Sequence, residues 1–597
     1  MSTFPGSLQR FLAIPLIATL ASLLVLVPFA MGWLEPQAWL VNNDHLAPFD
    51  YVRQLFAGQI DWNQITHARI PSVWPDYAIA GISLVLLGQG SSSFVLAWLL
   101  QFALCIFALY LFLPLLVGRR SALFCFAVAG IFLFSIFVFN DYRGIVFAAG
   151  IPARHGGNWI NVAFVLSLYL LACRLLCSRN WYWVFWALIF GGSMASVFSN
   201  RLFLIQVTAP LFLLYFAYLL VRSLSVLKSG GSIIRSRFSG LTLAVALGSL
   251  CGFAQYFFSM HQCEEVPLTT GFDALLPFLS GGGLLEPVWV FMCLSVLFLL
   301  VGIYLCCQEL RVFPVREVDF LASRTALRGV VLSFLGLSIL LNSLAYFSVS
   351  EDLFDQSLWR YLLVPAFLAP VGVGMLILPL LERLIPSGVI VVRRSYLLLV
   401  GLLGIAGVAL ESSILVSRVS NRYRSDYFGQ EEWLASLLRD QGLMGTLGYV
   451  ADPPWESRRI EFFSQSSIRA LSVSTDGNPR IHPHSRVQFL ERGEAINPLA
   501  PSSKDVISPS WFLASSKDFD RMKAFWGEPL SRVGCFGDKG CLYLFDREKV
   551  KANTSLFLST WHSEQYGCLR GSAEAARSKG LGLIRQIPVV GRFFVAG

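Results

Sequence analysis

The stretch Asn42-Asn43-Asp44-His45-Leu46-Ala47-Pro48-Phe49-Asp50 follows the first long apolar run of the chain and places polar and ionisable groups beside it. Ionisable groups next to membrane-length apolar segments are candidates for function, because they are costly to keep there. From Pro48 onward the pattern predicts a short amphipathic helix, with Pro48 in its first turn. Its apolar face is predicted to comprise Phe49, Val52 and Phe56. Asp44 would precede that helix and face water at the outer edge of the membrane. It would either have a functional role there or, with Asn43, only cap the helix.

The composition of the chain indicates a multispanning membrane protein. Of its 597 residues, 55% are hydrophobic and 14% are charged, and the mean hydropathy is +0.62. A soluble protein would carry charge at about a quarter of its positions. The formal charge of +9 does not indicate nucleic acid as a partner, because the basic residues fall mostly in short loops between apolar runs, as they do in membrane proteins.

Apolar runs of spanning length recur along residues 1–416 and predict about eleven transmembrane helices. The loop 32–93 holds one further apolar segment, Tyr77–Leu87, which is too short to span and is predicted to be re-entrant or interfacial. The predicted spans are Phe11–Met31, Phe94–Val117, Ala122–Phe139, Trp159–Cys177, Trp181–Phe198, Leu202–Val221, Leu241–Phe258, Val288–Cys307, Gly329–Phe347, Tyr361–Leu381 and Tyr396–Val416.

Lys and Arg residues predict the orientation of these spans in the inner (plasma) membrane. With the N-terminus in the cytoplasm, the cytoplasmic loops hold roughly fifteen basic residues and the outer loops roughly six. An odd number of spans exports the tail, so residues 417–597 are predicted to form an extracytoplasmic domain. The loop 32–93 lies on the same side, so the polar groups of the chain would collect at the outer face of the membrane.

The pattern of the tail predicts a small α/β or α+β domain. An amphipathic helix is expected at Glu431–Asp440. Strands are expected at Thr446–Val450, Val506–Ser515, Arg532–Phe536 and Cys541–Phe545. The last two flank a hairpin turn, where Cys535 and Cys541 would either form a disulfide or remain free thiols.

Three outer-face sites carry cations at the ends of predicted spans. Arg154 and His155 precede two glycines and Asn158, which can cap the next helix. This corner would bind a phosphate or touch lipid headgroups. Arg201, in a tight turn, would point into a cavity or toward headgroups. Arg360 begins a helix, where a cation needs an anionic partner. We expect Arg154, His155, Arg201 and Arg360 to converge on one anionic group.

The chain resembles the GT-C superfamily of membrane glycosyltransferases, in which a retained first span precedes a long outer loop with an early acidic residue. The motif that carries the resemblance is Asn43-Asp44-His45; the amphipathic helix, the spans and the exported tail agree with it. The resemblance implies a polyprenyl-phosphate-linked sugar as donor, a saccharide, glycolipid or protein as acceptor, and inverting transfer. Asp44 would be the general base and His45 would contact substrate. No cofactor is implied with certainty; a divalent metal stays open, because Asp50, Asp61 and Asp76 are not obvious second ligands.

Two other functions share parts of this pattern. A transporter or flippase of lipid-linked saccharides would also have many spans, but it should show polar or broken helices at mid-membrane. The predicted spans are nearly free of charge, which disfavours transport. A polymerase or ligase of lipid-linked saccharides would use the same donor chemistry, with its large outer loop between late spans.

The predicted topology is tested with reporter fusions. A reporter active only outside the cytoplasm should be active when fused after Val416 and silent when fused after Arg237, because an odd and an even number of spans precede these points. A cytoplasmic reporter should give the reverse pattern. Activity of the cytoplasmic reporter after Val416 would contradict the exported tail.

Overall fold

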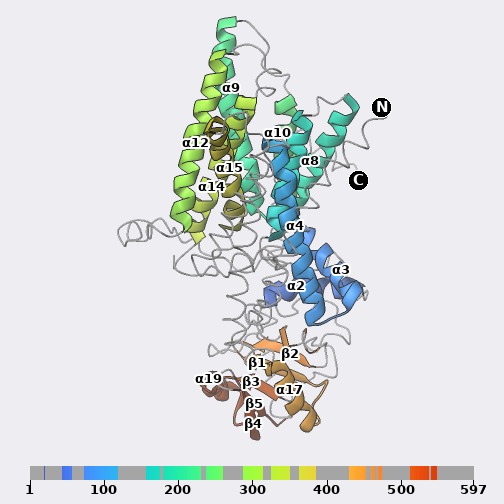
Figure 1. The fold of residues 1–597 in the computed structure, drawn as a ribbon. Coiled ribbons are helices and arrows are strands. Elements are labelled where there is room, and N and C mark those ends of the chain that lie inside the picture. Colours follow the sequence, from blue (N-terminus) through green and yellow to red (C-terminus); the bar gives the residue numbers. More distant parts are fainter. Residues whose placement is uncertain are drawn as a thin grey trace, which may run out of the picture.

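The computed structural model describes residues 19, 43–56, 73–117, 156–174, 179–229, 237–259, 287–312, 324–349, 362–384, 429–451, 459–460, 462, 464, 468–473, 511–536 and 540–546. These residues form a group of long helices with a small sheet beyond one end of it, and the short helices α2 and α3 lie between the two (Figure 1).

The long helices coincide with predicted spans, because in an apolar segment only a helix satisfies every backbone polar group internally. They are α4 (Ser91–Val117), α7 (Gly156–Arg174), α8 (Arg179–Ser199), α9 (Ala209–Ser229), α10 (Arg237–Ser259), α12 (Pro287–Val312), α14 (Arg324–Val349) and α15 (Leu363–Leu384). Within the described residues, 4 helices are long and apolar enough to cross a membrane. The predicted spans Ala122–Phe139, Tyr396–Val416 and, apart from the helical residue Thr19, Phe11–Met31 lie outside the described residues.

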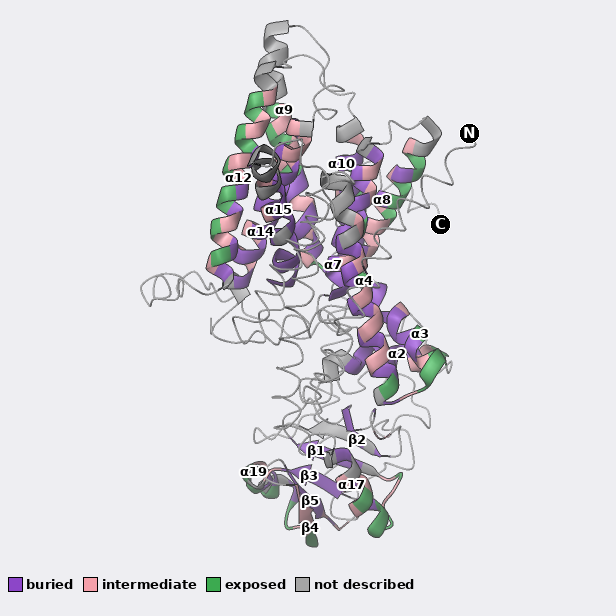
Figure 2. Ribbon diagram, viewed as in Figure 1, coloured by how far each residue is buried: buried purple, intermediate pink, exposed green. Residues whose placement is uncertain are grey.

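The outward faces of several long helices are apolar. Exposed residues follow one side of α12, while residues on its other side are buried (Figure 2). Exposed large apolar side chains on α9, α10 and α12 include Phe212, Phe216, Leu250, Leu300 and Ile303. Soluble monomers rarely expose contiguous apolar surfaces of this kind, so these faces suit a lipid environment.

Small residues allow two pairs of long helices to pack at close range. On α10, a Cβ at Gly248 or Gly252 would lie 2.3 Å from the carbonyl oxygen of Phe190 or Met194 on α8. Between α12 and α14, a Cβ at Gly336 would lie 2.7 Å from the carbonyl oxygen of Ser295. In lipid, helices associate largely through such close backbone packing.

The helix α2 (Asn43–Phe56) begins earlier than the sequence predicts. Pro48 lies inside the helix rather than in its first turn, and Asp44 is a helical residue rather than one that precedes the helix. Pro48 cannot donate the bond that would close on the carbonyl of Asp44, and an interior proline costs about 3 kcal/mol. Burial of Leu46 and Phe49 in the main core offsets that cost. Of the predicted apolar face, Phe56 is 66% exposed.

The segment predicted to be re-entrant or interfacial is helical. It consists of the π-helical turn η3 (Val73–Tyr77) followed by α3 (Ala78–Leu87), which packs against α4. The end of α3 exposes apolar side chains, among them Val85 and Leu86. A helix of this length cannot cross a bilayer.

The C-terminal elements form a mixed five-stranded sheet with the order β2-β1-β3-β5-β4. Strand β1 runs parallel to β2 and β3, and β5 runs antiparallel to β3 and β4. The elements are α17 (Gly429–Asp440), β1 (Leu447–Ala451), β2 (Arg469–Val473), β3 (Trp511–Ala514), α19 (Ser516–Trp526), β4 (Ser531–Cys535) and β5 (Cys541–Leu544). The predicted helix and the four predicted strands have counterparts here, whereas β2 and α19 were not predicted.

Alternate residues of the strands face different helices, as the two-residue period of a strand requires. Trp511 and Leu542 pack in one cluster with Leu434 of α17. On the other face, Tyr543 stacks on Phe519 of α19 at 3.8 Å between ring centroids. A disulfide joins Cys535 and Cys541, which the sequence left open.

The close approach of α8 and α10 yields a stability prediction. Gly248→Ala should lower the midpoint of thermal unfolding in detergent, because overpacking typically costs about 1–3 kcal/mol. Gly191→Ala on α8 is the matched control, since a Cβ there meets nothing within 4 Å. The control should leave the midpoint unchanged or raise it slightly. Equal midpoints for the two variants would contradict the packing.

Candidate functional site

The turn η3 contacts α2, α3, α7 and α8. It lies at the end of the long helices where α7 starts and α8 finishes, and we call this the η3 end. Two hydrogen bonds hold it there. The backbone N–H of Trp74 donates to Oγ of Ser199, at the end of α8, over 2.9 Å. Nδ2 of Asn161, on α7, donates to the carbonyl oxygen of Trp74 over 3.0 Å. The backbone of η3 is therefore fixed between the start of α7 and the end of α8.

Asp76 is the buried acidic residue of η3, and its carboxylate lies against the first turn of α7. A Cβ at Gly157 would be 2.7 Å from Oδ1 and 2.9 Å from Oδ2 of Asp76. Only glycine at position 157 leaves room for this contact. The N-terminus of a helix carries partial positive charge, which stabilises a carboxylate placed there.

A chain of buried side-chain amides starts at Asn158, in the same turn of α7. Its Nδ2 donates to Oε1 of Gln206, in the π-helical turn η4 (Leu204–Thr208) before α9. Nε2 of Gln206 donates to Oδ1 of Asn342 on α14 over 2.9 Å, and Nδ2 of Asn342 donates to the carbonyl oxygen of Ser338 over 2.7 Å. Oγ of Ser338 donates to the backbone oxygen of Gln206 over 2.7 Å. These bonds join α7, η4 and α14.

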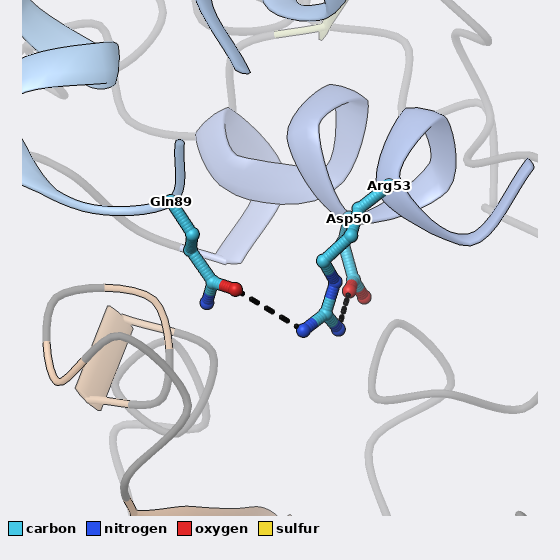
Figure 3. A network of polar contacts seen from close by, with 3 residues as sticks. All are labelled: Asp50, Arg53 and Gln89. Carbon is cyan, nitrogen blue, oxygen red and sulfur yellow. Dashed lines mark hydrogen bonds and ion pairs between the residues drawn. The ribbon is translucent and has the colours of Figure 1, made fainter. Parts of the chain in front are cut away.

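A second polar network joins α2 to the turn between α3 and α4 (Figure 3). Nη2 of Arg53 lies 2.7 Å from Oδ1 of Asp50, one turn earlier in α2. Nη1 of the same side chain donates to Oε1 of Gln89 over 3.2 Å. Asp50, one of the acids that the sequence offered beside Asp44, therefore takes part in holding α2 against the α3–α4 turn.

Arg201 lies in the turn that joins α8 to η4, at the η3 end. Its guanidinium carbon is 4.5 Å from the ring centroid of Tyr256, near the end of α10. The Tyr256 side chain is buried and packs with Phe198, with Val73 of η3 against them. Arg201 is an exposed residue, and a planar guanidinium held over an aromatic ring keeps its donors available.

The predicted site residues are described to different extents. Asn158 and Arg201 both lie at the η3 end. Asn158 does not cap α7 as expected, because the helix begins at Gly156 and the Asn158 amide donates to Gln206. Asp44 and His45 are backbone residues of α2, and their side chains lie outside the described residues. Arg154, His155 and Arg360 also lie outside the described residues, so convergence of the four cations stays a prediction.

The helix α2, which bears Asp44, packs against η3. Ala47, one turn after Asp44, belongs to the same buried cluster as Tyr51 and Tyr77. The rings of Tyr51 and Tyr77 are 5.9 Å apart between centroids. The helix that bears Asp44 therefore packs directly on the turn that holds Asp76.

Sequence reasoning missed Gln206, the partner of Asn158, and Asn342, the partner of Gln206. Gln206 lies inside the predicted span Leu202–Val221 and Asn342 inside Gly329–Phe347. An amide inside an apolar span needs a polar partner, which was the signal that could have identified both. Among the described residues, no three His, Cys, Asp or Glu side chains cluster as metal ligands would. The divalent metal that the sequence left open is not tested by this part of the chain.

One solved structure similar to this chain is the crystal structure of ArnT from Cupriavidus metallidurans bound to undecaprenyl phosphate. The sequences are 12% identical, and the TM-score is 0.43 over 91% of this chain and 98% of that one. No protein-family model and no curated protein sequence matches the chain. The proposal below therefore rests on the residues and the geometry of this chain.

Proposed function

We propose that the chain is an integral-membrane glycosyltransferase of the GT-C type, which moves a sugar from a polyprenyl-phosphate donor to an acceptor at the outer face of the membrane. The observation that carries the proposal is the gathering of polar groups at the η3 end of otherwise apolar helices. Asp76, Asn158 and Arg201 come from separate elements and lie at this end, where the helix that bears Asp44 also packs. Polar groups concentrated at one depth of an apolar bundle indicate a site for a substrate of mixed character.

The proposed reaction is a single displacement at the anomeric carbon. An acceptor hydroxyl attacks that carbon and forms the new glycosidic bond, while the bond from the carbon to the phosphate oxygen breaks. Asp44 takes the hydroxyl proton as general base, and polyprenyl phosphate leaves with the electron pair. Attack from the side opposite the leaving group inverts the configuration.

Cations at the η3 end would stabilise the charge that develops on the leaving phosphate. Arg201 has the donors for this role, and Arg154, His155 and Arg360 are proposed to join it from the neighbouring span ends. His45, next to Asp44 in α2, is proposed to contact the sugar or the acceptor. The polyprenyl chain would extend along an apolar helix face, of the kind exposed by the end of α3.

Transport of the lipid-linked saccharide is the second candidate. It would favour polar groups halfway along the helices. The amide chain of Asn158, Gln206 and Asn342 instead involves the first turn of α7, the turn before α9 and the later part of α14. That position supports catalysis at one face over a pathway through the membrane.

The proposal is tested in a strain that lacks the chain, by analysing glycolipids and polysaccharides after complementation. The wild type should restore one glycosylated product, and Asp44→Asn should not, because asparagine keeps the shape of the side chain and cannot accept the proton. Loss of a general base typically slows transfer by about 10²–10⁴-fold.

Asp50→Asn in the same helix is the matched control. It weakens the contact with Arg53 and should therefore lower the thermal midpoint while the product is still made. Full complementation by Asp44→Asn would overturn the role of Asp44. A product profile identical with and without the chain would overturn glycosyl transfer.

A further inference from the structure

The carbonyl oxygen of Asn158 is a buried acceptor at the η3 end. The residue is 3% exposed, and its Oδ1 has no donor among the described residues. A buried polar atom without a partner costs about 1–3 kcal/mol, so such an atom in a folded protein needs an explanation.

The hydrogen bonds of the rest of the amide chain determine which side-chain atom of Asn158 has no partner among the described residues. The carbonyl oxygen of Ser338, at the far end, can only accept, so Asn342 must direct its NH₂ group there. Asn342 then presents an oxygen to Gln206, and Gln206 in turn presents an oxygen to Asn158. Rotating the Asn158 amide alone would bring two carbonyl oxygens together. Its NH₂ group is therefore committed, and the atom it presents is an acceptor.

Asp76 places further acceptors in the same turn of α7. Its two carboxylate oxygens lie against Gly157, the residue before Asn158. The Asp76 carboxylate and the Asn158 carbonyl are both acceptors. Acceptors suit a hydroxyl group, which can donate, better than a phosphate, whose oxygens accept.

We propose that Oδ1 of Asn158 accepts a hydrogen bond from a hydroxyl of the sugar carried by the lipid donor. This inference rests on the proposed function and refines it: the start of α7 recognises the saccharide, and the phosphate is held by the cations of the span ends. Asn158 thus serves as a sugar-binding residue, oriented by Gln206 and Asn342.

The test compares two lipids with the purified full-length protein in nanodiscs: a polyprenyl phosphate, and the same polyprenyl phosphate carrying a single hexose. Asn158→Ala should weaken binding of the hexose-bearing lipid by about threefold to tenfold, the effect of one neutral hydrogen bond. Binding of the bare polyprenyl phosphate should be unchanged. Asn158→Thr, whose hydroxyl retains a donor near Gln206 but which lacks the carbonyl, should behave in the same way if the alanine variant folds poorly.

Ser338→Ala is the matched control, because it removes a buried hydrogen bond beside the amide chain and leaves the Ser338 carbonyl in place. Its ratio of affinities for the two lipids should equal that of the wild type. Equal losses for both lipids in the Asn158 variants, or no loss for either, would overturn the inference and leave the proposed function standing. Failure of the wild type to bind either lipid would overturn both.

Discussion

The buried amide chain from Asn158 through Gln206 to Asn342 is the constraint on which the η3 end depends. Between apolar helices no water is available to hydrogen-bond an unpaired amide. Each amide of this chain therefore needs a hydrogen-bond partner within the protein. Hydrogen bonds between membrane helices contribute only about 0.6–2 kcal/mol each, yet they specify which helices meet and at what rotation. Here they set α7, η4 and α14 in register. The start of α7 in turn carries the Asn161 bond that holds η3.

The sheet region is coupled to the same end through aromatic contacts. Phe49 of α2 lies 5.9 Å from Phe94 of α4 and 5.2 Å from Phe462, measured between ring centroids. Near Phe462 in the chain, Arg459 forms a buried ion pair with Glu431 of α17, with 2.9 Å between Nη2 and Oε1. Removing one member of a buried ion pair is costly. The helix that bears Asp44 is therefore packed against both α4 and the segment between β1 and β2.

Apolar length and period were enough to predict the long helices and the hairpin strands that contain Cys535 and Cys541, because both follow from local pattern. The start of α2 was predicted wrongly from local pattern. Pro48 was expected in the first turn, whereas α2 begins at Asn43 and buries Leu46 and Phe49. Local pattern also missed α19, although Oγ of Ser515 accepts from the N–H of Asp518 as an N-cap does. At the candidate site, sequence reasoning selected Asn158 and Arg201 but assigned Asn158 a capping role. Its partner Gln206 lies 48 residues further along the chain. Asn342, the partner of Gln206, lies another 136 residues on, and only tertiary structure brings the three together.

The most direct test of the account is to locate the lipid phosphate on the protein. A polyprenyl phosphate with a photoreactive group in the isoprene unit next to the phosphate is bound to the purified protein and cross-linked, and the labelled peptides are identified by mass spectrometry. Labelling is predicted in α2, η3, α3 and the turn between α8 and η4 that carries Arg201, and an excess of unmodified polyprenyl phosphate should abolish it. Labelling confined to the exposed faces of α9 and α12, or insensitive to competition, would contradict the account.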